Sequence, residues 1–194
     1  MSEQPKRLMR LFLAVFPPAD VQRAAAEIID ALRRPGDSVS WVKPDNLHYT
    51  LRFIGEVGED GARRIAEAAQ VAAGSCAAFD AVLGGVGAFP NARRGRVLWL
   101  GMTAGDRELV VLAKALERAL DSRGFEPERR AFSPHLTIGR VRESRDDWTP
   151  RLAEAPEADP VRTRFRVDRL CVVESRLNPK GSIYTVREAA MLGE

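Results

Sequence analysis

Apolar and polar positions follow two different periods along the chain, and the changes between them predict its elements. Helical spacing, with apolar residues every three or four positions, covers 19–34, 59–73 and 105–123. Strand-like runs, apolar or alternating, cover 8–16, 39–42, 47–57, 79–89, 96–102, 135–141, 165–174 and 182–187, the last two reading as a terminal hairpin. The charged, proline-containing segment 143–160 predicts a loop with at most a short helix. This mixture indicates an α+β protein.

The order strand, helix, strand occurs twice. An apolar strand that begins at Arg10 leads through a helix to the strand of His48, and one that begins at Arg96 leads through a helix to the strand of His135. The two strand starts lie 86 positions apart and the two histidines 87. We interpret this offset as an internal duplication that gives two similar lobes with a cleft between them. Coincidence within an ordinary α+β protein is the alternative.

The chain contains only two histidines, and both open the same phrase, His-x-Thr-aliphatic. Side chains alternate along a strand, so His48 shares a face with Thr50, and His135 shares a face with Thr137. If the two lobes are related by a pseudo-twofold axis, both pairs point into one cleft. The pattern therefore predicts two imidazoles and two hydroxyls around one small volume.

Such a set of groups suits cleavage of a phosphodiester without a metal. One imidazole takes a proton from an attacking water and the other gives one to a leaving oxygen, because their pKa lies near neutrality. Threonine hydroxyls can donate hydrogen bonds to the nonbridging oxygens as charge builds there. Two structural histidines are one alternative. A zinc site is another, but zinc needs a third and usually a fourth ligand, and no cysteine or carboxylate has a suggestive spacing.

Composition narrows the class of protein without deciding it. The formal net charge is +3 and arginine outnumbers lysine, which weakly favours an anionic partner. Cys76 and Cys171 are too few for a disulfide framework, and we expect buried free thiols. No apolar stretch approaches the roughly 20 residues of a membrane span, and Arg10 interrupts the first apolar run. We therefore expect a cytoplasmic protein with no membrane partner.

Longer stretches around both motifs resemble a known family. They are RLFLAVFPP, WVKPDNLHYTLRFIGEV, GAFPNARRGRVLWLG and RRAFSPHLTIGRV. Together with the paired motifs they resemble the 2H phosphoesterases and, more closely, the RNA 2′,3′-cyclic phosphodiesterases, also called the LigT-like or 2′-5′ RNA ligase family. Residues 143–194 resemble the family only loosely. The resemblance implies a bilobal fold in which two lobes of antiparallel sheet with outer helices surround a central cleft. Residues 1–194 would form a single domain of two intertwined lobes, each supplying one motif strand.

The resemblance also implies an activity and roles for residues. The family hydrolyses RNA 2′,3′-cyclic phosphate ends to 2′-phosphomonoesters, and some members join 2′-5′ linkages in tRNA halves. His48 would be the proton donor and His135 the proton acceptor, Thr50 and Thr137 would hold the phosphate, and no metal or cofactor would be needed. The alternatives are a 2H phosphoesterase for small cyclic nucleotides or 2′-5′ oligonucleotides, and a non-catalytic module that binds RNA ends. We expect a monomer, because one chain supplies both halves of the cleft.

Two arginines are further candidates for the phosphate. Arg140 matches an arginine of the family's second motif, and its guanidinium could pair with the phosphate. Strict alternation would place Arg140 on the face opposite His135, although Gly139 could permit a bulge that turns it back. Arg52 lies on the face of the first histidine by alternation and is the second candidate.

Basic and aromatic residues outside the motifs leave two interpretations open. The basic stretches 93–96 and 129–130 could contact an RNA backbone, although charged runs are more often simply solvated. One of Phe12, Phe53, Phe132 and Trp99 could stack on a terminal base. Core packing is the default for all four.

Overall fold

A computed structural model describes residues 8–143, 147–179 and 181–193 and confirms the predicted α+β class. The strands are β1 (Met9–Val15), β2 (Val39–Trp41), β3 (Tyr49–Val57), β4 (Phe79–Phe89), β5 (Val97–Ala104), β6 (Leu136–Val141), β7 (Arg164–Val167), β8 (Arg169–Arg176) and β9 (Ile183–Met191). The helices are α1 (Ala19–Leu32), α2 (Glu59–Gly74), α3 (Asp106–Asp121) and α4 (Thr149–Ala153), with short 3₁₀ turns η1 (Pro44–Asn46) and η2 (Ala92–Arg94). The expected short helix in 143–160 is thus α4.

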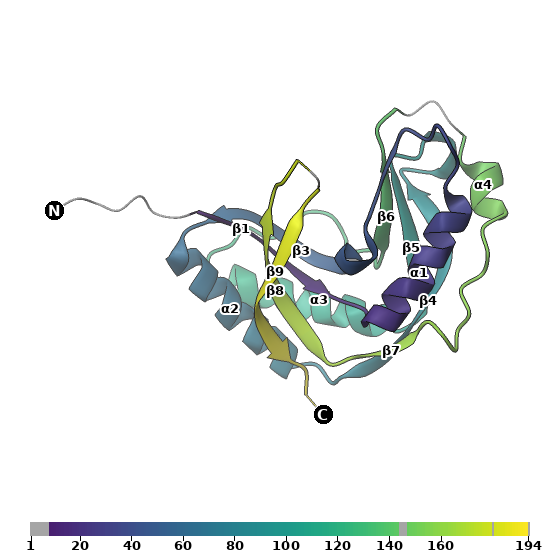
Figure 1. The fold of residues 1–194 in the computed structure, drawn as a ribbon. Coiled ribbons are helices and arrows are strands. Elements are labelled where there is room, and N and C mark those ends of the chain that lie inside the picture. The colour runs from purple at the N-terminus through teal and green to yellow at the C-terminus, as the bar shows by residue number, and fades with distance from the viewer. Residues whose placement is uncertain (1–7, 144–146, 180, 194) are drawn as a thin grey trace.

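The strands form one antiparallel sheet whose order is symmetric about its middle. The order is β7-β4-β5-β6-β3-β1-β8-β9, with β2 beside β6. Counted outward from the centre, β6 corresponds to β3, β5 to β1, β4 to β8 and β7 to β9. A single residue pair, Tyr49 with Leu136, joins β3 to β6. We call β3, β1, β8 and β9 the first half-sheet and β6, β5, β4 and β7 the second half-sheet. Figure 1 shows the sheet bending strongly between them.

Helices cover the outer face of this sheet. Helix α2 packs against α3 and against strands of the first half-sheet, α3 contacts β3 and β5, and α1 contacts the η1 turn. The expected bilobal arrangement with outer helices is confirmed. No helix in the described part of the chain is long and apolar enough to cross a membrane.

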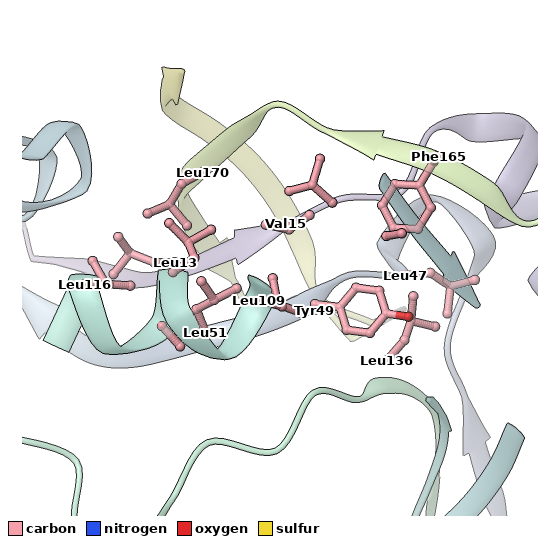
Figure 2. Close-up of a cluster of buried hydrophobic side chains, with 14 of the residues drawn as sticks. Leu13, Val15, Leu47, Tyr49, Leu51, Leu109, Leu116, Leu136, Phe165 and Leu170 are labelled. Atoms are coloured by element: carbon pink, nitrogen blue, oxygen red, sulfur yellow. The ribbon is translucent and has the colours of Figure 1, made fainter. Parts of the chain in front are cut away.

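The seam between the half-sheets is held by the main apolar core. Tyr49 and Leu136 are fully buried and lie among leucines of β1 and α3 (Figure 2). Burying an apolar side chain of this size stabilises a fold by roughly 1.5–3 kcal/mol. The Tyr49 hydroxyl also donates a hydrogen bond of 3.2 Å to the Gly101 carbonyl of β5. The core therefore fixes the place where the two motif strands meet.

One predicted strand is wrong as a single element. Residues 165–174 form parts of two strands, because the chain leaves β7, which pairs with β4, and enters β8, which pairs with β1 and β9. The break lies at Asp168, whose carbonyl accepts a hydrogen bond of 2.8 Å from the Leu192 N–H. Apolar alternation continues on both sides of the break, so the sequence pattern does not reveal it. The terminal hairpin, β8 with β9, is confirmed.

Candidate active site

The seam brings the two His-x-Thr motifs together. His48 and His135 each lie one residue before the strand that carries the rest of the motif. Continuing the register of the single pair across the seam by one residue in either direction sets His48 opposite Thr137, and Thr50 opposite His135. We call the face of the sheet that bears these four side chains the motif face. Each histidine is thus a neighbour of the other motif's threonine.

Both imidazoles are oriented in the same way by the backbone. The Nδ1–H of His48 donates to the Asn46 carbonyl at 2.6 Å, and the Nδ1–H of His135 donates to the Ser133 carbonyl at 2.8 Å. A carbonyl oxygen only accepts, so Nδ1 carries the proton in each ring. Nε2 is therefore the nitrogen that can exchange a proton with a ligand in both histidines.

The turn before His48 is itself anchored. Pro44 begins the η1 turn, and the Asn46 side-chain amide donates to the Ser182 carbonyl at 3.0 Å. The buried Gln22 amide of α1 donates to the Leu47 carbonyl at 3.1 Å. These bonds hold the backbone whose carbonyl orients the imidazole.

Aromatic rings surround the two histidines unequally. His48 has Phe12, Phe16 and Tyr184 at centroid distances of 4.9, 5.3 and 5.2 Å. His135 has Phe89 edge-on at 5.0 Å. Aromatic contacts of this kind fix the plane of a ring. The first histidine is the more enclosed of the two.

The enclosure of His48 also affects its acid–base behaviour. Burial lowers the pKa of His48, the positive charges of Arg140 and His135 lower it further, and the hydrogen bond to the Asn46 carbonyl partly opposes them. His48 is therefore neutral at neutral pH in the free protein. The influence of Arg140 and His135 also shows that these two side chains lie within electrostatic range of His48.

Acidification from about pH 7 to about pH 5 should lower the free energy of unfolding through His48. The unfolded chain binds a proton at the ordinary histidine pKa of about 6.5, and the folded chain binds it only at lower pH, so protons favour unfolding as pH falls. Urea unfolding of the protein and of His48→Gln over this range measures the effect. The variant should show the shallower slope; equal slopes would contradict the account. Carboxyl groups with lowered pKa, such as Glu27 and Asp60, titrate below this range.

Arg140 returns to the motif face through a β-bulge. Leu98 of β5 pairs with Gly139, but the next residue, Trp99, pairs with Thr137, so Ile138 is an extra residue in β6. A bulge of this kind reverses the alternation beyond it. The exposed Arg140 therefore lies on the side of Thr137.

A second bulge, in β3, turns the other candidate arginine, Arg52, away from the motif face. Ala14 of β1 pairs with Thr50 and Leu13 pairs with Arg52, so Leu51 is the extra residue. Arg52 consequently lies on the face of the buried Leu13, which packs toward α3. The prediction that Arg52 shares the face of His48 is wrong, because it assumed unbroken alternation.

Arg52 instead ties the chain before the second motif to α3. Its guanidinium lies 3.4 Å from Glu117 of α3 and 3.6 Å from Glu128, and it donates to the Glu126 carbonyl. Only 11% of its side chain is exposed. The guanidinium is therefore paired with carboxylates of the protein, and its contacts position the segment that leads to His135.

Several contributing groups were missed by sequence reasoning. They are the Asn46 and Ser133 carbonyls and the rings of Phe16, Phe89 and Tyr184. The carbonyls carried a usable signal, because each lies two residues before its histidine. The rings carried none, since the segments that bear them meet the motifs only in the folded chain. The basic side chains of 93–94, 96 and 129–130 are exposed, as a solvated run would be.

The residues that the structure describes contain no group of three or more His, Cys, Asp and Glu side chains placed to hold a metal ion. Cys76 and Cys171 are buried free thiols, as expected from the sequence. Burial raises the pKa of the Cys171 thiol.

Comparison with known proteins places this site in a family. Residues 13–179 match the family described as the 2′-5′ RNA ligase superfamily. A Thermotoga maritima protein named RNA 2′,3′-cyclic phosphodiesterase is 37% identical over 92% of this chain and 92% of its own length. A protein of the same name from Methanothermobacter thermautotrophicus is 34% identical over 95% of this chain and 99% of its own.

Comparison with solved structures supports the same family assignment. The crystal structure of a Thermus thermophilus protein has a TM-score of 0.80 and 30% identity, covering 95% of this chain and 98% of the other. Escherichia coli LigT, solved with 3′-AMP, has a TM-score of 0.77 and 26% identity, covering 97% of this chain and all of its own. The predicted family and enzyme class, a hydrolase acting on phosphodiester bonds, are confirmed. The chain belongs to the 2′-5′ RNA ligase superfamily.

Proposed function

We propose that the protein hydrolyses the 2′,3′-cyclic phosphate at an RNA end to a 2′-phosphomonoester, with His48 as proton donor and His135 as proton acceptor. The observation that carries the proposal is the pair of imidazoles at the seam, each with Nδ1 bonded to a backbone carbonyl and Nε2 left for chemistry. The names of the related proteins support the substrate class.

The proposed step divides two proton transfers between the two half-sheets. His135 Nε2 takes a proton from water as the water oxygen forms a bond to phosphorus. His48 Nε2 gives a proton to the 3′ oxygen as its bond to phosphorus breaks. Attacking and leaving oxygens lie on opposite sides of phosphorus in an in-line displacement, which suits one imidazole from each side of the seam. Thr50 and Thr137 donate to nonbridging oxygens, and Arg140 pairs with the developing charge.

His48 must be protonated to act as donor, although burial lowers its pKa in the free protein. An anionic phosphate beside the ring favours the imidazolium and raises the pKa. The proposed donor therefore acquires its proton as substrate binds. The enclosing aromatic rings exclude water from this imidazole, which strengthens its interaction with the anion.

The same two histidines suit 2′-5′ joining as a second activity. The matched family is named for RNA ligation, and joining replaces the attacking water by the 5′-hydroxyl of a second RNA end. That hydroxyl gives its proton to His135 as it forms a bond to phosphorus, and the 3′ oxygen leaves with a proton from His48. We extend the proposal to joining of tRNA halves. Small cyclic nucleotides and 2′-5′ oligonucleotides remain alternative substrates. We further propose that residues 1–194 act as a single domain and as a cytoplasmic monomer that binds RNA ends without a metal.

Phosphorus NMR tests this function. Purified protein is incubated with a short RNA that ends in a 2′,3′-cyclic phosphate, with and without EDTA. A 2′-phosphate that forms equally in both samples is expected. A 3′-phosphate product would mean that the 2′ oxygen leaves instead of the 3′ oxygen. Loss of turnover in EDTA would contradict the metal-free mechanism. Binding without turnover would favour a module that only binds RNA ends.

A further inference from the structure

The segment that leads to His135 has no helix or strand of its own. Residues 125–135 connect α3 to β6 without regular structure, and the side chains of 126–131 are exposed. The Ser133 carbonyl, which orients the His135 imidazole, belongs to this segment. The position of the proposed proton acceptor therefore depends on the contacts that this segment makes with neighbouring elements.

Arg52 of β3 is at the centre of those contacts. It donates to the Glu126 carbonyl, and its guanidinium lies 3.6 Å from the carboxylate of Glu128. The same guanidinium lies 3.4 Å from Glu117 of α3, whose carboxylate accepts a hydrogen bond of 3.0 Å from the Glu128 N–H. The Glu128 carboxylate in turn accepts a bond of 3.3 Å from the Arg130 N–H. We call this group of contacts, made by Arg52 with Glu117 and Glu128, the Arg52 clasp.

The clasp ends close to the carbonyl that orients His135. Arg130, whose N–H it holds, lies three residues before Ser133, which is about 10 Å of chain at most. Two carboxylates meet at one guanidinium in the clasp, so without Arg52 they would repel each other. Loss of Arg52 should therefore push the segment away from α3 and displace the Ser133 carbonyl.

The two histidines are anchored by different chemistry. Neutral amides, those of Asn46 and Gln22, hold the backbone around His48. A charged cluster holds the backbone that leads to His135. The arginine of this cluster belongs to the strand of the first motif, so the first half-sheet positions the histidine of the second. A change at Arg52 should disturb one imidazole and leave the other in place.

We propose that Arg52 is a positioning residue for the proton acceptor, because its clasp holds the Ser133 carbonyl against the Nδ1–H of His135. This inference rests on the proposed function of the histidine site. An imidazole that loses this bond divides its proton between its two nitrogens, and the form with a proton on Nε2 cannot take another from water there. Arg52 therefore acts on the reaction through His135, without touching the substrate.

Nitrogen-15 NMR of the imidazoles tests this placement without a substrate. The chain has only two histidines, so His48→Gln and His135→Gln assign both rings, and the ¹⁵N shifts report which nitrogen carries the proton. Arg52→Met should move neutral His135 from the Nδ1–H form toward a mixture and leave His48 in the Nδ1–H form. Arg162→Met, which removes an exposed arginine paired with Glu27, is the matched control and should alter neither ring. An unchanged His135 ring, or the same change in both rings, would overturn the proposal.

Kinetics tests whether the displacement matters for the reaction. Arg52→Met should lower kcat for a 2′,3′-cyclic nucleotide by about 10–10²-fold with little change in KM, the effect of a misplaced catalytic group. In a His135→Ala background the same change should cost nothing further, because the acceptor is already absent. An equal loss in that background would overturn the proposal and assign Arg52 a role in the stability of the fold.

A second variant keeps the inference testable if Arg52→Met does not fold. Glu128→Ala weakens the clasp at an exposed position and should change the His135 ring and kcat in the same direction. Wild-type behaviour of this variant in both measurements would overturn the proposal. If the unaltered protein turns over no 2′,3′-cyclic nucleotide, the proposed function fails, and the imidazole NMR then decides whether Arg52 positions His135.

Discussion

Replacing His48 or His135 by alanine should lower kcat for a 2′,3′-cyclic nucleotide by about 10²–10⁴-fold while leaving the fold largely intact. Each variant removes one of the two proposed proton transfers, and no other histidine can replace it. The double variant should be little slower than either single variant, because residues that act as a unit are not additive. Steady-state kinetics and circular dichroism on the same samples measure both expectations.

Asparagine variants separate chemistry from positioning. His48→Asn and His135→Asn place an amide where Nδ1–H donates to the upstream carbonyl, but they have no group at Nε2. They should therefore be as inactive as the alanine variants. Activity above about one tenth of the original in either asparagine variant would assign that histidine a structural role, because general acid–base catalysis contributes at least about 10²-fold.

Thr50→Val and Thr137→Val should each lower kcat by about 10²–10³-fold, the cost of removing one donor to a developing oxyanion. Valine keeps the shape of threonine, and neither side chain is fully buried, so the loss of the hydroxyl should not disturb the core. The effect should fall mainly on kcat, because charge on the nonbridging oxygens grows toward the transition state.

Serine variants are the matched controls for this prediction. Thr50→Ser and Thr137→Ser keep the hydroxyl and should keep most of the activity. A valine variant within about twofold of the original kcat would exclude that threonine from the proposed stabilisation, since a lost donor costs far more. A serine variant as inactive as valine would indicate that the methyl group matters instead.

The repeated motif made the site predictable in outline. His48 and His135 stand in matched sequence frames, which we interpret as a duplication. This interpretation predicted that the two histidines lie close together, and the register across Tyr49 and Leu136 brings them together. The pairing of each histidine with the other motif's threonine was not predictable, because it depends on which residues meet at the seam.

The arginines show where pattern reading fails. A bulge adds one residue without changing the apolar pattern, since Leu51 and Ile138 both look like ordinary core positions. The sequence therefore placed Arg52 on the wrong face and left Arg140 in doubt, and only the pairing with β1 and β5 corrects both. Phe53 gained its position on the motif face by the same shift.

The asymmetry of the histidines also arises from packing. Both motifs read alike, but Phe12 and Tyr184 enclose the first histidine and come from strands far apart in sequence. Burial then lowers the pKa of His48. Nothing in the local phrase around either histidine carries this difference.

The most direct test of the two-histidine account uses a substrate whose leaving group needs no proton. A nucleoside 2′,3′-cyclic phosphate with sulfur at the bridging 3′ position expels a thiolate, so turnover should no longer depend on the proton donor. His48→Ala should then come within about tenfold of the unaltered protein, whereas His135→Ala should keep a loss of about 10²-fold or more. If only His135→Ala recovered activity on this substrate, His135 would be the proton donor and His48 the proton acceptor. Equal losses in both variants on this substrate would contradict the division of proton transfer between His48 and His135.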